Sequence, residues 1–410
     1  MIKELKVTRS RMISKEKATS KRTLLACSII IVNTFAWYSC GFVILKEILS
    51  EYLEEFLFWS INFVGAALSI LIGASIANNL RRRILVAFWL VLGIFSSLIP
   101  NLLNQYTAIN ILIIFLLFGI SFGLGIPVCM AYFTECTTIE NRARHGGAIL
   151  FFIGLGTLFL SSLRFDIMLS TLVLAAWRGS SLLFLPWIRV NKDIDKKTKK
   201  ISYMSILNQR SFLLYLGPWI MFCLVNYLSA PIIINFFGED FVRTSTLIEG
   251  GLVGIFAIVG GIFADKVGRK PLIIIGFILL GLGYAILGIR PESLLSWYIY
   301  TVIDGIAGGI ILTIFIFTLW GDIAFDCCSE KYYAIGGLPY LLSNFLRLII
   351  GQYVIQTVLV YTIFSLVSLF LFLAVVPLMF APETLPEKKI RERELRQYIE
   401  KAKKIKEKFT

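Results

Sequence analysis

The sequence predicts an all-α membrane protein of twelve transmembrane helices, and three observations support this fold class. The chain has 410 residues, of which 57% are hydrophobic and only 16% are charged, whereas soluble domains carry charge at about a quarter of their positions. Apolar stretches recur that are long enough, at about 20 residues, to cross a hydrocarbon core of roughly 30 Å as helices. The charged residues gather between these stretches, which is typical of membrane-spanning helices and their loops.

Twelve segments of the chain meet this length requirement. Pro186 ends the sixth of them, because proline cannot donate the backbone hydrogen bond of a helix. The segments lie at about 23–46, 56–78, 84–104, 107–133, 146–164, 167–188, 211–237, 244–264, 271–289, 295–320, 336–357 and 359–381.

Charged segments divide the twelve spans into two groups of six. A basic tail covers residues 1–22, a charged linker covers 189–210, and a second charged tail covers 382–410. We therefore predict one six-helix bundle over 23–188 and another over 211–381. The amino tail runs into the first span without a cleavage-site pattern, so we expect no signal peptide to be removed.

The distribution of lysine and arginine predicts the orientation. If both termini are cytoplasmic, all but six of the 40 basic residues lie on the cytoplasmic side, as the positive-inside bias requires. Basic loops that face an anionic leaflet also explain the net charge of +14 without a nucleic-acid partner. We predict a multi-pass protein of the plasma membrane with both termini in the cytoplasm. The six other basic residues are Lys46, Arg164, Arg178, Arg243, Arg290 and Arg347.

Residues for metal, disulfide or enzyme chemistry are scarce. The seven cysteines form no C-x-x-C pair, and the single histidine, His145, has no metal-ligand partner at a useful spacing, so we expect neither a disulfide nor a zinc site. The sequence contains no Walker-type loop, so we expect no direct use of ATP. A membrane-embedded enzyme such as an acyltransferase would need a base, and His145 lacks an acidic partner. We therefore expect no enzymatic activity and no cofactor.

The most informative segment joins the eighth and ninth spans and reads Gly261-Ile-Phe-Ala-Asp-Lys-Val-Gly-Arg-Lys270. Gly261 lets two helices approach closely, and Gly268 permits the positive φ of a tight turn. Asp265, at a helix end, can pair with a cation or with a helix N-terminus across a closing gap. Together with Arg269, this spacing resembles the signature loop of the major facilitator superfamily, whose members carry small solutes across membranes.

The two halves of the chain repeat several landmarks at nearly one offset. Such agreement predicts two six-helix bundles in parallel repeat, which is the architecture that the resemblance also implies. The matched positions, 187 to 189 residues apart, are Gly73 with Gly261, Arg81 with Arg269, Gly119 with Gly308, and Glu135 with Asp322.

Two further patterns resemble the sugar-porter branch of the superfamily. Glu135 and Arg142 keep its Glu-x6-Arg spacing after the fourth span, and Pro382-Glu-Thr384 resembles its tail motif. The resemblance implies gating roles for residues at the ends of the spans. These residues are Gly73, Arg81, Glu135, Arg142, Gly261, Asp265, Gly268, Arg269 and Asp322.

Three positions depart from the pattern. Ala77 stands where the first signature loop carries an acid, and Phe115 stands where many relatives place an arginine in the fourth span. The segment Gly154-Leu-Gly156 lacks the proline of the antiporter motif, which favours uptake over efflux. Because Phe115 replaces this arginine, a proton-coupling mechanism that depends on the arginine cannot be transferred from relatives to this chain.

Charged residues inside the spans need a reason, because each costs about 2.5–3.5 kcal/mol to insert. Asp304 in the tenth span and Arg347 in the eleventh lie at similar depth, so they are candidates either for binding solute or proton or for a static ion pair. Glu249 is a candidate gate or buried partner, and Arg178 is expected to make a helix contact. On helices that line the cavity in relatives, the polar and aromatic candidates are Asn33, Trp37, Tyr38, Trp219, Asn226, Tyr227 and Tyr300.

The resemblance and the repeat imply a secondary transporter that works by alternating access. The expected cargo is a small polar organic solute, sugar-like or an organic acid, moved by proton symport or uniport through a monomer in the lipid bilayer. A sensor or receptor that keeps the fold but no longer cycles is an alternative, favoured by the lost acid at Ala77. An efflux antiporter is a further alternative.

Overall fold

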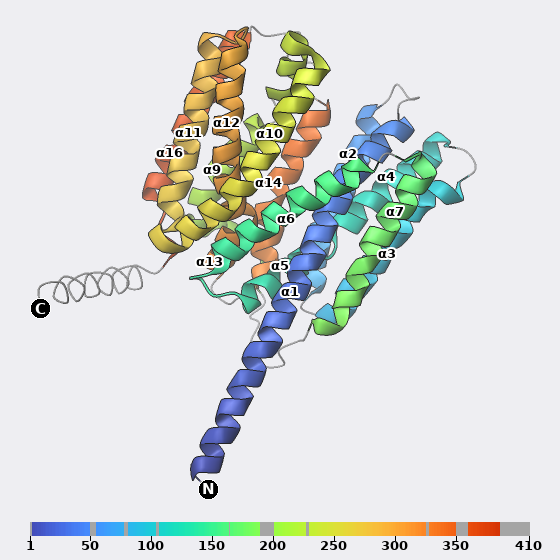
Figure 1. Ribbon diagram of the computed structural model, residues 1–410, viewed down its shortest axis with the longest axis vertical. Helices are drawn as coiled ribbons and strands as arrows, with labels where there is room; N and C mark the ends of the chain where they lie inside the picture. Colours follow the sequence, from blue (N-terminus) through green and yellow to red (C-terminus); the bar gives the residue numbers. More distant parts are fainter. Residues whose placement is uncertain are drawn as a thin grey trace, which may run out of the picture.

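The computed structural model describes residues 2–49, 55–77, 81–103, 106–163, 165–188, 201–226, 229–324, 328–349 and 360–385. Within these ranges the regular elements are helices, in agreement with the fold class that the hydrophobic spans predict. The helices form two bundles that stand side by side (Figure 1), the amino bundle coloured blue to green and the carboxyl bundle yellow-green to red.

The amino bundle holds the first six predicted spans. The fourth span is interrupted after Gly123, and a Cβ atom on the following Gly125 would lie 2.1 Å from the ring of Trp89. Pro127 then begins α5, in the first turn of a helix where proline is tolerated. The elements are α1 (Ile2–Leu49), α2 (Glu55–Ile76), α3 (Arg82–Leu102), α4 (Ala108–Gly123), α5 (Ile126–Cys136), α6 (Arg142–Ser162), α7 (Ile167–Ser180) and the 3-10 helix η1 (Ser181–Trp187).

The carboxyl bundle holds the remaining spans. Its tenth span is continuous from α12 through a short π-helix, η2, into α13. The elements are α8 (Tyr203–Leu207), α9 (Arg210–Val225), α10 (Ser229–Val267), α11 (Arg269–Ile289), α12 (Leu294–Leu312), η2 (Thr313–Thr318), α13 (Leu319–Ile323), α14 (Ser329–Ile349) and α16 (Val360–Phe380).

The predicted end of the seventh span at 237 coincides with a break in the helix at Gly238, but the seventh span itself is interrupted after Val225. The sequence predicts spans over 211–237 and 244–264, but α9 ends at Val225 and α10 runs from residue 229 to residue 267 with one non-helical residue, Gly238. The φ of Gly238 is 75°, a value that glycine adopts without steric cost. The chain therefore bends at a single glycine, where the sequence analysis expects a longer polar loop.

Ten helices or consecutive helix pairs within the described ranges are long and apolar enough to cross a membrane. The eleventh predicted span, 336–357, overlaps α14 and ends outside the described residues. Large apolar side chains such as Phe152, Phe159 and Leu366 are more than half exposed, which a surrounding lipid phase accounts for. The protein is thus an all-α multi-pass membrane protein.

Glycines allow close helix contacts within each bundle. A Cβ atom on Gly119 of α4 would lie 2.2 Å from the carbonyl oxygen of Asn62 in α2, and one on Gly309 of α12 would lie 2.7 Å from that of Val253 in α10. Gly308 would meet only the Val253 side chain, at 3.4 Å. The packing counterpart of Gly119 is therefore Gly309, one residue beyond the predicted match.

Between the bundles, α6 and α10 pack closely over only part of their length. Cβ atoms on Gly147 and Gly261 would lie 2.0 Å and 2.4 Å from carbonyl oxygens of the facing helix, whereas Cβ atoms on Gly154 and Gly250 would meet nothing within 4 Å. We call the closely packed end, where α3, α6 and α11 begin, the inner end of the molecule. The opposite end is the outer end.

Candidate functional site

Charged side chains join the two bundles at the inner end. Four of them, Arg142, Arg269, Asp322 and Glu330, are at most 3% exposed. Charges withdrawn from water in this way persist only when they are paired and hydrogen-bonded. We call the whole set the inner network, and it consists of Arg82, Glu135, Arg142, Asp265, Arg269, Asp322, Glu330 and Glu383.

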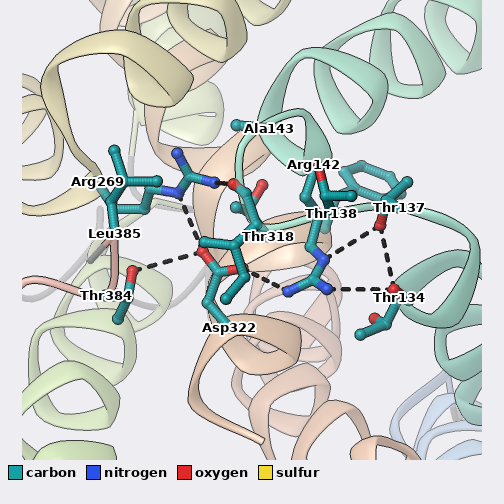
Figure 2. A network of polar contacts seen from close by, with 12 residues as sticks. Thr134, Thr137, Thr138, Arg142, Ala143, Arg269, Thr318, Asp322, Thr384 and Leu385 are labelled. Carbon is teal, nitrogen blue, oxygen red and sulfur yellow. Dashed lines mark hydrogen bonds and ion pairs between the residues drawn. The ribbon is translucent and has the colours of Figure 1, made fainter. Parts of the chain in front are cut away.

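Asp322 lies at the centre of the inner network (Figure 2). Its Oδ2 accepts from Arg269 Nε at 3.0 Å and from Thr384 Oγ1 at 3.4 Å, and its Oδ1 pairs with Arg142 Nη1. Asp322 and Arg269 belong to the carboxyl bundle, whereas Arg142 begins α6 of the amino bundle. One carboxylate therefore pairs with an arginine from each bundle and holds the inner ends together.

The guanidinium of Arg142 is fixed by its own bundle before it reaches Asp322. Its Nε donates to Thr137 Oγ1 at 3.2 Å, and its Nη2 donates to the carbonyl oxygen of Thr134 at 3.1 Å (Figure 2). Charge-assisted bonds to several acceptors preorganise a planar guanidinium. Arg142 thus presents its remaining nitrogen to the facing bundle in a single orientation.

Asp265 bridges the bundles through the backbone. Its Oδ1 and Oδ2 accept from the amides of Ala143 and Arg144 at 3.1 Å and 3.0 Å. These amides lie in the first turn of α6, where N–H groups have no partner in their own helix and carry a partial positive charge. The sequence analysis expects Asp265 to meet a cation or a helix N-terminus, and it meets both, because Arg269 Nη2 also lies 3.1 Å from Oδ1.

The turn between α10 and α11 depends on Gly268. Its φ is 122°, in the region that favours glycine, so the predicted positive φ is confirmed. The carboxylate of Glu383 accepts from the next two amides, those of Arg269 and Lys270, at 2.9 Å and 3.0 Å. The Pro-Glu-Thr segment thereby caps the start of α11 and fixes the backbone from which Arg269 projects.

The amino half of the inner network is built around Arg82. Arg82 pairs with Glu135 of its own bundle and with Glu330 of the carboxyl bundle, each at 2.5 Å. Arg82 and Glu135 lie 187 residues before Arg269 and Asp322. The counterpart of Arg269 is therefore Arg82, and the predicted Arg81 is an exposed residue that precedes α3.

Glu330 is a network residue that the sequence analysis missed. It is 1% exposed and lies in the first turn of α14. A signal was present, because Glu330 follows Arg142 by 188 residues, the offset of the repeat. Because Glu330 carries the opposite charge to Arg142, a comparison of like residues in the two halves does not detect the match.

A cavity of about 50 Å³ lies between the bundles, enough for a few water molecules. Most of its lining side chains are aromatic or aliphatic, and both bundles contribute to it. The lining residues are Phe35, Ile70, Phe122, Ile126, Met130, Trp219, Ile316, Trp320, Tyr333, Gly336, Gly337, Tyr340 and Leu341. We call this space the central cavity.

Tyr333 connects the central cavity with the inner network. Its hydroxyl donates to the carbonyl oxygen of Phe317 at 2.6 Å and accepts from Thr134 Oγ1 at 3.2 Å. The carbonyl oxygen of Thr134 in turn accepts from Arg142. A solute that displaced Tyr333 would therefore disturb residues that hold Arg142.

Toward the outer end the bundles meet through aromatic side chains of α2 and α14. The rings of Phe63 and Phe345 stack with centroids 4.8 Å apart, and Phe56 approaches Phe345 at 6.4 Å. Phe63 and Phe345 border a second, smaller cavity of about 10 Å³, the outer cavity, which shares Leu341 with the central cavity. Ring contacts of this kind separate without leaving a charge unpaired.

Three predicted residues of the first span lie away from the central cavity. Asn33 donates to the hydroxyls of Ser180 and Ser181 at 3.0 Å and 3.1 Å, and Trp37 Nε1 donates to Ser97 Oγ at 2.7 Å. These bonds hold α1 against α7, η1 and α3. Tyr38 borders the outer cavity, and its hydroxyl donates to Asn62 Oδ1 at 2.9 Å.

Asp304 is buried inside the carboxyl bundle, where it hydrogen-bonds with Tyr300 and lies near Glu249. It does not line the central cavity within the described residues. The side chain of Arg347 lies outside the described residues, and so does Tyr227, so the predicted Asp304–Arg347 pair stays a prediction. Asn226 follows the last residue of α9.

Arg178 makes the helix contact that the sequence analysis expects. It is fully buried in α7, its guanidinium carbon lies 4.2 Å from the ring centroid of Trp89 and 5.1 Å from that of Trp37, and it donates to Thr34 Oγ1. Cation–π contacts stabilise a guanidinium that is removed from water. Arg178 therefore ties α7 to α1 and α3.

Solved structures of transporters share this arrangement. The human organic anion transporter MFSD10 (TETRAN) matches with a TM-score of 0.69 and 12% identity, over 88% of this chain and 99% of that one. The proton:xylose symporter XylE, bound to 6-bromo-6-deoxy-D-glucose, matches with a TM-score of 0.68 and 17% identity, over 90% and 97%. The Escherichia coli fucose:proton symporter FucP matches with a TM-score of 0.69 and 12% identity, over 87% and 98%.

Neither a protein-family model nor a curated protein matches the sequence. The matched structures cover nearly the whole chain at low identity, so they establish its fold. XylE is described as a member of the major facilitator superfamily. With two helical bundles, a cavity between them and a charged inner end, this chain has the major facilitator fold.

Proposed function

We propose that this chain is a secondary active transporter that moves a small organic solute across a membrane by alternating access. The observation that carries the proposal is the central cavity between two bundles that are joined at the inner end and separate along α6 and α10 toward the outer end. Rocking of one bundle against the other exposes such a site to each side in turn. The transport activity named for the three matched structures supports the proposal.

In this mechanism the inner network is the gate that must open to release solute inward. Opening breaks the Arg142–Asp322 and Arg82–Glu330 pairs and removes Asp265 from the start of α6. Each charge then needs water, so the gate opens only when the inner ends separate far enough to hydrate it. With both termini cytoplasmic, as the distribution of basic residues predicts, the inner end faces the cytoplasm.

Asp304 is the proposed coupling residue. It is a carboxylate buried within the carboxyl bundle beside a second carboxylate, Glu249. Burial and a neighbouring carboxylate both favour the protonated form of a carboxyl group over the charged form. Proton binding at Asp304 would then be linked to the helix packing of α10 and α12, which meet closely at Gly305.

Transport into vesicles tests the proposal. Full-length protein is reconstituted, a proton gradient is imposed, and uptake is measured for labelled sugars, organic acids and neutral aromatic compounds. We expect saturable, gradient-driven accumulation of at least one solute. Asp304→Asn should abolish that accumulation and leave solute exchange partly intact, because exchange needs no net proton movement.

The matched control is Asp166→Asn, which removes the same charge from an exposed position outside the bundles. Unchanged accumulation in Asp304→Asn would reject Asp304 as the coupling residue. Saturable binding without uptake of any solute would reject transport and favour the non-cycling sensor. A sugar-like or organic-acid cargo stays a prediction from the sequence, and the cavity walls favour a different chemistry.

A further inference from the structure

We propose that the central cavity binds a neutral aromatic solute that carries a hydrogen-bond acceptor. This inference rests on the proposed function, because it names the class of solute that the transporter carries. Three observations on the cavity walls support it: flat aromatic faces held in place, one buried donor without a partner, and open space at Gly337.

The aromatic faces are fixed before any solute arrives. Trp219 stacks nearly parallel with Phe315 at 4.7 Å and with Tyr340 at 6.0 Å. Its Nε1 donates to the carbonyl oxygen of Gly336 at 2.7 Å. A rigid ring loses little conformational freedom when a second ring stacks on it, so such a wall favours flat apolar solutes.

Trp320 supplies a donor that has no partner. It is 1% exposed and lines the central cavity, and its Nε1 makes no hydrogen bond within the described residues. This nitrogen lies 2.4 Å from the point that a Cβ atom on Gly336 would occupy, and Gly336 lines the same cavity. A buried donor is costly to leave unpaired, so an acceptor on the solute would stabilise the complex here.

The walls offer little to sugars or anions. None of the described lining residues is charged, and the hydroxyl of Tyr333 and the indole N–H of Trp219 are already bonded to protein groups. A sugar would bury many hydroxyls without partners, and an anion would be buried without a counter-charge.

The wall of α14 leaves space for a ring at Gly337. A Cβ atom there would meet nothing within 4 Å, although the residue lies in the middle of a helix, where glycine is otherwise unfavourable. The cavity in this conformation holds only about 50 Å³. Because its walls come from both bundles, separation of the outer halves enlarges it without repacking either bundle.

Equilibrium binding to the full-length protein in lipid nanodiscs tests the inference, with empty nanodiscs subtracted. Coumarin is the probe, because it is a neutral two-ring compound with a carbonyl acceptor. Naphthalene matches its size without an acceptor, and benzoate and D-glucose represent the anionic and the sugar-like class. We expect saturable binding of coumarin, at least tenfold weaker binding of naphthalene, and no saturable binding of benzoate or D-glucose.

Two variants locate the site. Trp320→Phe keeps an aromatic ring and removes the donor, so it should weaken coumarin at least tenfold and leave naphthalene nearly unchanged. Gly337→Leu fills the hollow and should abolish binding of both compounds. Gly154→Leu is the matched control, since a Cβ atom there also meets nothing within 4 Å but the residue does not line the cavity, and it should bind like the unaltered protein.

The outcomes separate this inference from the proposed function. Absence of saturable coumarin binding, or equal losses of coumarin and naphthalene in Trp320→Phe, would overturn the inference. Saturable binding of D-glucose or benzoate that is lost in Gly337→Leu would also overturn the inference. In that case, uptake of the same solute into vesicles would still support the proposed transport function. If coumarin binds with the expected variant pattern but no solute is taken up, the proposed transport function is rejected and the proposed binding site is retained.

Discussion

The two halves of the inner network occupy equivalent positions of the repeat but differ in charge. Arg82 and Glu135 in the amino half correspond to Arg269 and Asp322 in the carboxyl half. Neither Ala77 nor Asn78, however, supplies the acid that Asp265 supplies in the carboxyl half. The helices that follow Glu135 and Asp322 also differ. Arg142 lies in the first turn of α6 in the amino half, and Glu330 lies in the first turn of α14 in the carboxyl half.

These two differences sort the charges by bundle. In the Arg142–Asp322 and Arg82–Glu330 pairs, the amino bundle supplies the arginine and the carboxyl bundle supplies the acid. The contact of Asp265 follows the same rule, because the positive end of α6 belongs to the amino bundle. A strict repeat would have mixed both signs on each face. The comparison teaches that the repeat fixes where the groups lie, while its departures make the two faces complementary.

Removal of the shared carboxylate should have the largest effect on this complementarity. Asp322→Asn leaves Arg142 without a carboxylate partner and leaves Arg269 with Asp265 alone. Breaking a buried pair in this way costs about 3–5 kcal/mol. We expect a lower thermal unfolding midpoint and a larger population with separated inner ends. Asp240→Asn, an exposed residue near the start of the eighth span, is the control, and an equal loss in that variant would contradict the account.

The Arg82–Glu330 pair should have an intermediate effect. Glu330→Gln leaves Arg82 paired with Glu135, so we expect a cost of about 1–3 kcal/mol. A double-mutant cycle with Arg82→Gln measures the pair itself, and denaturation in detergent should give a coupling energy of about 0.5–3 kcal/mol. Additive effects of the two substitutions would show that the pair does not join the bundles.

Asp265 should have the smallest effect of the three. Asp265→Asn keeps an acceptor for one amide of α6 but removes the charge that faces the helix end and Arg269. We expect a cost of about 0.3–1 kcal/mol, reduced by high salt where the site is accessible to ions. Thermal unfolding at low and high salt measures it. A loss as large as that of Asp322→Asn would mean that Asp265, not Asp322, is the centre of the network.

Residues whose partners are close in sequence or repeated between halves were predictable. The spans, the close approach at Gly261, the positive φ of Gly268 and the meeting of Asp265 with a helix end follow from local spacing and composition. The break after Val225 was missed because it falls inside a predicted apolar span, where hydropathy does not register it.

The contacts across the two bundles were the least predictable. Glu330 pairs with a residue of the opposite bundle, and nothing in its own neighbourhood indicates that partner. Trp320 and Tyr340 are ordinary aromatic residues of predicted spans, and Tyr333 lies just before one. Only the packing of the two bundles reveals that the three surround one cavity. Asn33 and Trp37 were predicted to bind solute but bond to neighbouring helices instead. Polar residues in a span can stabilise helix packing as well as bind a solute.

Distances measured across both ends of the molecule test the central claim most directly. Genetically encoded spin labels at Ser162 and Asp240 report on the outer ends of α6 and α10, and labels at Arg83 and Val267 report on the inner ends. All four residues are exposed. The account predicts that Asp322→Asn adds a population in which the inner distance grows while the outer distance shrinks. An inner distance that stays fixed, or two distances that grow together, would contradict a pair of bundles rocking about a shared cavity.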